Sequence, residues 1–480
     1  MKKPTKNKPV TLAAVGLSIL VMAALTAFCY VAGYSLIIPL LLLIIGIHLY
    51  FFDKASVKLF LQLGLLLALI LFSADALAKY TTIPYYYIPV ASIGMLVILL
   101  YNDLQLVFLM SFMSSVLVGL MVGNDLKLTL IFFIGSLTAA YIVKDARTRG
   151  ELIQTGFFVG LIQVLAVVLL NPAVDFLFSK TFLMHYLQPL LINGFVVTGV
   201  VMVTLKVFEY LFGVLTNFSL LELSDFNQPL LRRMIVEAPG TYHHSLIVSN
   251  LSESAADSIG ANSLLTRVGA YYHDIGKMVK PEYFTENQMI GGSKHDNIEP
   301  SISKLVILNH VKEGLEIAKK YKLSPLIAKF IPEHHGTGII YYFYQRALEG
   351  AQGEAIDEQH YRYPGPKPQS RETAITLLAD SVEGAVRALD DPTPPRIDET
   401  VRKVVNNKFI DGQLDECNLT LKEIEIISST FSRVLSAMYH SRIKYPEKRD
   451  EDANNHKKPS EKNSAKSQSN HKNGQSHSSA

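Results

Sequence analysis

The sequence predicts an all-α protein in which a polytopic transmembrane helical bundle is followed by an all-helical domain in the cytosol. Three observations predict this fold class. The first half contains repeated apolar runs of membrane-spanning length, the second half has apolar residues at helical spacing, and histidines and aspartates recur along those later helices. The composition agrees, because 49% of the 480 residues are hydrophobic.

Charge and cysteine content restrict the function further. A net charge of +3 is too small to indicate binding to a nucleic acid polymer. Of the two cysteines, Cys29 lies in an apolar run and Cys417 in the polar half. This usage predicts no disulfide framework and fits a reducing compartment.

Eight apolar runs are each near the roughly 20 residues that a bilayer core requires. The basic residues between them fall on one side of the membrane only if the number of spans is even. We therefore expect a multi-pass protein of the cell membrane with both termini in the cytoplasm. A seven-span alternative stays open, with the first run removed as a signal peptide or two runs merged. The predicted spans are residues 10–32, 35–52, 57–78, 84–101, 104–123, 127–143, 153–171 and 190–214.

Four regions follow from this pattern: a transmembrane region (1–216), an amphipathic connector (217–239), a helical domain (240–446) and a polar tail (447–480). The connector mixes leucines with charged residues, so it is either a packed linker or a helix along the bilayer surface, and we favour the linker. Lys206, in the last span, is expected to extend to the headgroups. The tail is too polar to offset the entropy cost of ordering and is expected to be disordered.

The doublet His273-Asp274 is the first chemical signal in the helical domain. It follows a predicted helix from Ser263 to Tyr272, with Ser263 as N-cap and Gly276 as helix stop. An imidazole next to a carboxylate offers one nitrogen ligand and two oxygens, so Asp274 is expected to bridge two metal ions. Lys277 follows within one turn, where its ammonium can bind a phosphate.

Further candidate ligands fall on separate predicted helices: His244, His310, the pair His334-His335, and Asp380. A lone histidine on an apolar face is more often a hydrogen-bonded core residue. The ordered set on successive helices nevertheless indicates a metal-dependent hydrolase. His243 is an alternative to His244, but His244 shares a face with apolar residues and His243 points about 100° away.

The second half resembles an HD-domain phosphohydrolase, and more closely the membrane-anchored 7TM-HD family of bacterial cyclic di-AMP phosphodiesterases. The resemblance covers nearly all of the cytosolic part. It is carried by Glu237 to Ser245, Gly269 to Lys277, Ile331 to Gly336, Tyr361 to Pro368, Leu378 to Glu383 and Asp411 to Thr420.

The resemblance implies two ions with a shared aspartate, and hydrolysis of cyclic di-AMP to linear pApA. It implies one ion held by His244, His273, Asp274 and Asp380, and a second held by Asp274, His310, His334 and His335. Five imidazoles and two carboxylates suit iron or manganese, and softness alone does not exclude zinc. The expected partners are the cyclic dinucleotide, the lipid bilayer and a second copy of the chain.

The family usually has a large extracellular domain after the first span, whereas here only about two residues, Gly33 and Tyr34, separate the first two runs. Three alternatives remain open. A phosphodiesterase for cyclic di-GMP is disfavoured, because that class places Gly-Tyr-Pro soon after the His-His pair and this chain has Gly336-Thr-Gly. An HD-type nucleotidase would use the same metals. A nucleotide-binding receptor without catalysis would not need the complete ligand set.

Overall fold

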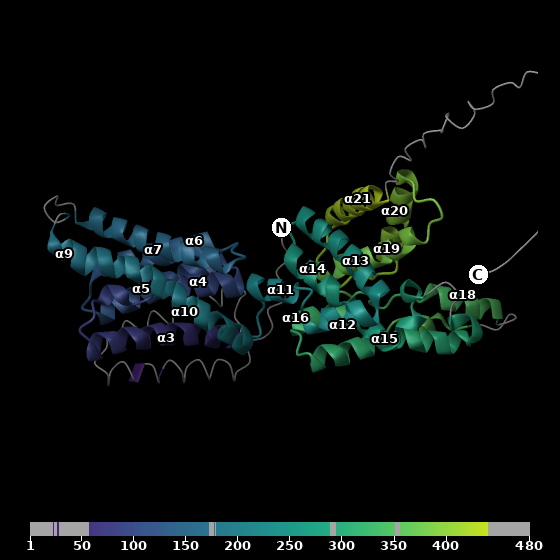
Figure 1. The fold of residues 1–480 in the computed structure, drawn as a ribbon, viewed down its shortest axis with the longest axis horizontal. Coiled ribbons are helices and arrows are strands. Elements are labelled where there is room, and N and C mark those ends of the chain that lie inside the picture. The colour runs from purple at the N-terminus through teal and green to yellow at the C-terminus, as the bar shows by residue number, and fades with distance from the viewer. Residues whose placement is uncertain are drawn as a thin grey trace, which may run out of the picture.

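The computed structural model describes residues 57–171, 179–288, 294–350 and 356–439, together with a few isolated positions. The regular secondary structure of these residues is helical, and their one β-bridge pairs Ile339 with Arg362. Figure 1 shows the helices of residues 57–212 as one body and those of residues 239–438 as a second body beside it. The predicted all-α fold class is confirmed.

Five segments of the described chain are long and apolar enough to cross a membrane. Each overlaps a predicted span. The predicted spans 10–32 and 35–52, and the polar tail, lie outside the described residues. The five are α3 (Val57–Tyr80), α5 (Leu104–Met121), α6 (Leu126–Val143), α7 (Arg149–Leu170), and a continuous segment made of α9 (Lys180–Phe182), η2 (Leu183–Leu187) and α10 (Gln188–Phe212).

The predicted span 84–101 is shorter than expected. Pro84 and Pro89 interrupt its first half, which forms only the 3-10 turn η1 (Tyr85–Tyr87) before α4 (Ala91–Tyr101). Every residue of α4 except Tyr101 is buried. The apolar character of this run therefore reflects a core helix that is surrounded by its neighbours.

Glycines bring α7 and α10 into close contact. A Cβ on Gly194 of α10 would overlap the backbone of Gly156 on α7, so no side chain fits at this crossing. Close backbone approach at small residues is a common mode of helix packing in membranes. Gly199, also on α10, has nothing within 4 Å of its Cβ position and makes no such contact.

The connector contains α11 (Asn217–Leu223) and α12 (Pro229–Glu237). Its buried apolar residues belong to the core of the second body, as a packed linker requires. This is the interpretation that the sequence favoured over a helix along the bilayer. The residues are Leu220, Leu230, Leu231 and Met234.

Lys206, which the sequence predicts to extend to the headgroups, contacts the connector in the structure. Its Nζ lies 2.7 Å from Glu222 Oε2 and donates to Ser219 Oγ at 3.0 Å, so it binds the connector. The carboxylate of Glu222 on α11 is thus an acceptor for this ammonium within the protein. The buried Glu209, also on α10, accepts a 2.8 Å hydrogen bond from Ser219. The last span is thereby joined to α11 by polar contacts, next to a cavity of about 750 Å³.

Two large apolar cores stabilise the second body, beside a smaller cluster of Phe343, Ala347 and Tyr361. One is built mainly by α13, α19, α20 and α21, and the other by α14, α15, α16 and the connector. The elements are α13 (Pro239–Ser258), α14 (Ser263–Tyr272), η3 (Ile275–Val279), η4 (Pro281–Tyr283), η5 (Thr285–Asn287), η6 (Lys294–Asn297), α15 (Pro300–Lys320), α16 (Pro325–Ala328), α17 (Phe330–Glu333), α18 (Tyr341–Gly350), η7 (Glu358–Tyr361), α19 (Arg371–Arg387), α20 (Pro394–Ile410) and α21 (Leu421–Met438).

Candidate metal centre

The His273-Asp274 doublet lies at the C-terminal end of α14, and both side chains are fully buried. The predicted N-cap of this helix was wrong by one residue. Asn262 is the N-cap, since its side chain accepts a 3.0 Å hydrogen bond from the backbone N–H of Leu265. His273 ends the helix, and Asp274 begins the turn that leads into η3.

Gly276 holds η3 against α15. A Cβ at this position would overlap the carbonyl oxygen of His310, so only glycine fits. The predicted role as a helix stop misses this contact. Because the two backbones touch here, the His310 ring lies beside the doublet, with its Nε2 3.5 Å from Asp274 Oδ1.

His244 on α13 faces Asp380 on α19. Its Nε2 lies 3.0 Å from Asp380 Oδ1 and 3.6 Å from Asp274 Oδ2. His244 is 4% exposed, whereas the neighbouring His243 is exposed to solvent. The structure thus brings His244 to the cluster and leaves His243 outside it.

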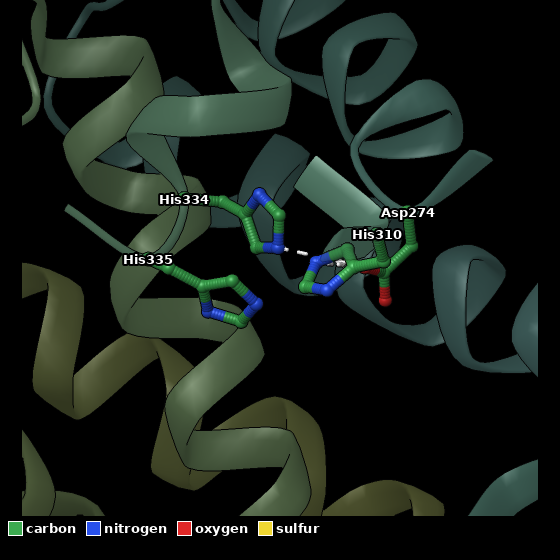
Figure 2. Close-up of side chains that lie close together, drawn as sticks. All are labelled: Asp274, His310, His334 and His335. Atoms are coloured by element: carbon green, nitrogen blue, oxygen red, sulfur yellow. Dashed lines mark ion pairs between the residues drawn. The ribbon is translucent and has the colours of Figure 1, made fainter. Parts of the chain in front are cut away.

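The His334-His335 pair follows α17 and completes the cluster (Figure 2). The Nε2 atom of His334 lies 3.5 Å from Asp274 Oδ1, and His335 Nδ1 lies 3.8 Å from Asp380 Oδ2. The His335 ring stacks on Tyr363, with a centroid distance of 4.1 Å. In Figure 2 the rings of His334 and His335 both project toward His310 and Asp274.

Hydrogen bonds fix the orientation of four imidazoles. In each ring Nδ1 contacts an oxygen of the protein. A carbonyl oxygen can only accept a hydrogen bond, so the Nδ1 atom that faces one carries the proton. In such a ring, when it is neutral, Nε2 keeps its lone pair. Among the described residues, Nε2 of His273, His310 and His334 is buried and has no hydrogen-bond partner. Such orphaned nitrogens fit a metal ion. The pairs are His244 with Glu383, His273 with Ala270, His310 with Ile307, and His334 with Phe330.

Two groups of side chains have the geometry of metal-binding sets, and they share Asp274. Within each group one ligand atom per residue lies within 4.8 Å of the others. The nitrogen and oxygen donors suit a divalent cation. The first group is His244, His273, Asp274 and Asp380, and the second is Asp274, His310, His334 and His335.

The histidines of the two ligand groups differ in the direction of their pKa shifts. Burial alone would lower the pKa of His273, but the carboxylates of Asp274 and Asp380 reverse this effect and raise that pKa to about 10. Burial lowers the pKa of His310 to about 4, and burial together with His334 and His310 lowers the pKa of His335 well below its ordinary value. The imidazole His273 is therefore protonated at neutral pH without metal, and the other two are neutral.

Lys277 lies inside the cluster. Its Nζ lies 2.7 Å from Asp274 Oδ2 and 2.8 Å from Glu286 Oε1. Burial alone would lower the pKa of Lys277, and these two carboxylates raise it above its ordinary value. In the structure the ammonium thus compensates the negative charge of Asp274, at a position next to both groups of ligands.

Two residues of the site, Glu383 and Glu286, had no assigned role in the sequence, and Tyr363 was expected either to pack in the core or to stack on a purine base. Glu383 accepts a 2.7 Å hydrogen bond from His244 Nδ1, Glu286 pairs with Lys277, and Tyr363 stacks on His335. Glu383 lies three residues after Asp380 on one helix, and this spacing is a signal that could have identified it. Glu286 lies in the short 3-10 helix η5 and Tyr363 in a loop, so no helical periodicity relates either residue to the ligands.

Family models match both bodies of the chain. The model described as "7TM receptor with intracellular HD hydrolase" matches residues 28–216, and the HD domain model matches residues 241–385. Fold and site therefore define a membrane-anchored protein with an HD domain. The chain belongs to the membrane-anchored 7TM-HD family.

The chain is also similar to two curated proteins, both cyclic-di-AMP phosphodiesterases. The chain is 37% identical to the cyclic-di-AMP phosphodiesterase PgpH of Bacillus subtilis, over 85% of this chain and 60% of the relative. It is 40% identical to PgpH of Listeria monocytogenes, over 75% of this chain and 50% of the relative. The chain thus spans 50–60% of the length of these curated relatives. A crystal structure of the L. monocytogenes PgpH HD domain in complex with cyclic di-AMP is 46% identical, covering 45% of this chain and all of that chain, with a TM-score of 0.43.

Proposed function

We propose that this chain is a metal-dependent phosphodiesterase that hydrolyses cyclic di-AMP to the linear dinucleotide pApA and so lowers the level of a second messenger. The observation that carries the proposal is the pair of buried ligand groups that share Asp274. Three of their imidazole nitrogens have no hydrogen-bond partner among the described residues. The names of the PgpH relatives supply the substrate.

We assign the first ion to His244, His273, Asp274 and Asp380, and the second to Asp274, His310, His334 and His335. Iron or manganese suits this donor set. When bound, two such ions activate a water molecule for attack on phosphorus and neutralise charge on the phosphoryl oxygens.

The other groups of the site act on the ligands and on the substrate. Glu383 holds the His244 ring with Nε2 toward the centre, as the 2.7 Å contact indicates. Lys277 balances Asp274 and, in the complex, donates to a non-bridging oxygen of the scissile phosphate. Tyr363 supports the His335 ring by stacking.

We propose that the helical domain, residues 240–446, lies in the cytoplasm together with both termini. The support is the clustering of basic residues on one predicted side of the membrane. A homodimer is the proposed assembly, and light scattering of the detergent-solubilised chain would test it.

The test is a comparison of substrates. The full chain, purified in detergent and loaded anaerobically with Fe²⁺ or Mn²⁺, is expected to cleave cyclic di-AMP faster than cyclic di-GMP or nucleoside monophosphates. Preference for a monophosphate would identify a nucleotidase. Preference for cyclic di-GMP would show that cyclic di-AMP is not the main substrate. Tight binding of cyclic di-AMP without turnover in every metal would identify a receptor.

A further inference from the structure

Lys408, near the end of α20, is a half-buried lysine with no hydrogen bond or ion pair to any residue that the structure describes. The other cations around the site are paired there. Lys277 contacts Asp274 and Glu286, Arg362 contacts Glu358 and Asp411, and Lys367 contacts Asp415. Lys408 is the exception, and it is not a member of either ligand group.

The ammonium of Lys408 lies at the loop that directly follows the His334-His335 pair. A Cβ built on Gly338 would lie 3.0 Å from the carbonyl oxygen of His335 and 3.2 Å from Lys408 Nζ, so both atoms approach Gly338. The same loop is closed by a 2.9 Å hydrogen bond from the backbone N–H of Tyr363 to the Gly338 carbonyl. Lys408 therefore lies at the margin of the metal centre on the side of His335 and Tyr363.

The nearby carboxylates are already occupied. Asp411 binds Arg362 at 2.8 Å and Gln413 at 2.9 Å, while Asp380 faces His244 at 3.0 Å. Burial lowers the pKa of Lys408, although the charges of Asp380 and Asp411 oppose this effect. A partly desolvated ammonium without an acceptor is unfavourable, and an anion from outside the protein would relieve the cost.

We propose that Lys408 binds the second phosphodiester of the cyclic dinucleotide, the one that is not being cleaved. This inference rests on the proposed function. A cyclic dinucleotide carries two phosphodiesters on opposite sides of its ring, so when one lies at the ions the other projects to the margin of the site. A nucleoside monophosphate has no second phosphate and gains nothing from Lys408. The residue therefore selects dinucleotides over mononucleotides.

The test compares Lys408→Gln, Lys408→Arg and Lys403→Gln in the metal-loaded full chain. Lys403 is an exposed lysine on the same helix and serves as the matched control. A charge-assisted hydrogen bond is worth a factor of about ten to a hundred in affinity. Lys408→Gln is therefore expected to raise KM for cyclic di-AMP by about tenfold or more with little change in kcat. Lys408→Arg keeps the positive charge and should give a KM close to that of the wild type. Lys403→Gln should leave KM unchanged.

Two further readouts separate binding from a structural effect. The KM of Lys408→Gln should rise about tenfold more for cyclic di-AMP than for bis(p-nitrophenyl) phosphate, which has a single phosphate. The affinity for a non-hydrolysable phosphorothioate analogue of cyclic di-AMP should fall in parallel. Equal losses on both substrates, or an unchanged KM in Lys408→Gln, would overturn the role of Lys408 and leave the proposed function intact. If the wild-type chain neither binds nor cleaves any cyclic dinucleotide, both proposals are overturned.

Discussion

The hydroxyl of Tyr272 donates a 2.7 Å hydrogen bond to the carbonyl oxygen of Leu223. Tyr272 is buried and directly precedes the His273-Asp274 doublet, while Leu223 is the last residue of α11. Because α11 is also bonded to the last span through Ser219, a short series of polar contacts runs from the membrane region to the helix end that carries the doublet.

Tyr272→Phe is expected to lower stability modestly. The variant keeps the ring and removes one partly buried hydrogen bond, which costs about 0.5–1.5 kcal/mol and leaves the Leu223 carbonyl without this donor. Thermal unfolding of the detergent-solubilised chain measures the loss. Tyr271→Phe is the matched control, because no hydrogen bond of the Tyr271 hydroxyl is found in the described structure. An equal shift in both variants would refute the importance of this bond.

Asp274→Ala is expected to abolish metal loading and turnover together. The carboxylate belongs to both ligand groups, so its loss removes a ligand from each proposed ion. Metal content by elemental analysis and hydrolysis of cyclic di-AMP are the two measurements. Full activity in this variant would rule out the two-metal assignment.

Glu383→Ala is expected to weaken loading of the first ion by about 10- to 100-fold, because His244 loses the acceptor that fixes its ring. Titration with Mn²⁺ should then show one weakened site and one unchanged site. Glu383→Gln keeps an oxygen acceptor and should recover part of the affinity. Glu399→Gln, an exposed residue on α20, is the control and should bind both ions normally. Loss of both ions to the same extent would contradict this role.

Metal binding to the first group is expected to strengthen as pH rises. The pKa of His273 is raised from 6.5 to about 10 in the metal-free protein, so at neutral pH its proton must leave before an ion binds. Apparent affinity should improve by up to about tenfold per pH unit between roughly pH 6.5 and 10. The same shift stabilises the metal-free fold below pH 6.5, and that contribution is lost as pH rises through about 10. Titrations at fixed ionic strength that give a pH-independent affinity would refute this.

Gly194→Val is expected to destabilise the membrane body, because a side chain at Gly194 overlaps the backbone of Gly156. Overpacking of this kind costs about 1–3 kcal/mol or more. Gly199→Val on the same helix is the matched control, because open space surrounds its Cβ position. Thermal stability in detergent should fall for the first variant alone. Equal behaviour of the two variants would mean that the α7–α10 crossing is not tightly packed.

The sequence predicted the fold class and the family, and it grouped the candidate ligands that the structure brings together. These signals are local: apolar runs reveal spans, and each candidate ligand lies on a helix or directly after one. What it missed depends on tertiary contacts. The pairing of Lys206 with Glu222, and the approach of Glu286 to Lys277, join residues from different elements whose spacing carries no signal. The two prolines that shorten the fourth predicted span were visible, but hydropathy outweighed them.

The contact between Gly276 and the carbonyl of His310 makes the approach of His310 to the His273-Asp274 doublet a property of the main chain. In a saturation library, residue 276 should be as intolerant of replacement as the ligands themselves, although glycine has no functional group to lose. A screen that scores only side-chain chemistry would overlook this position, where mere volume separates a working centre from a broken one.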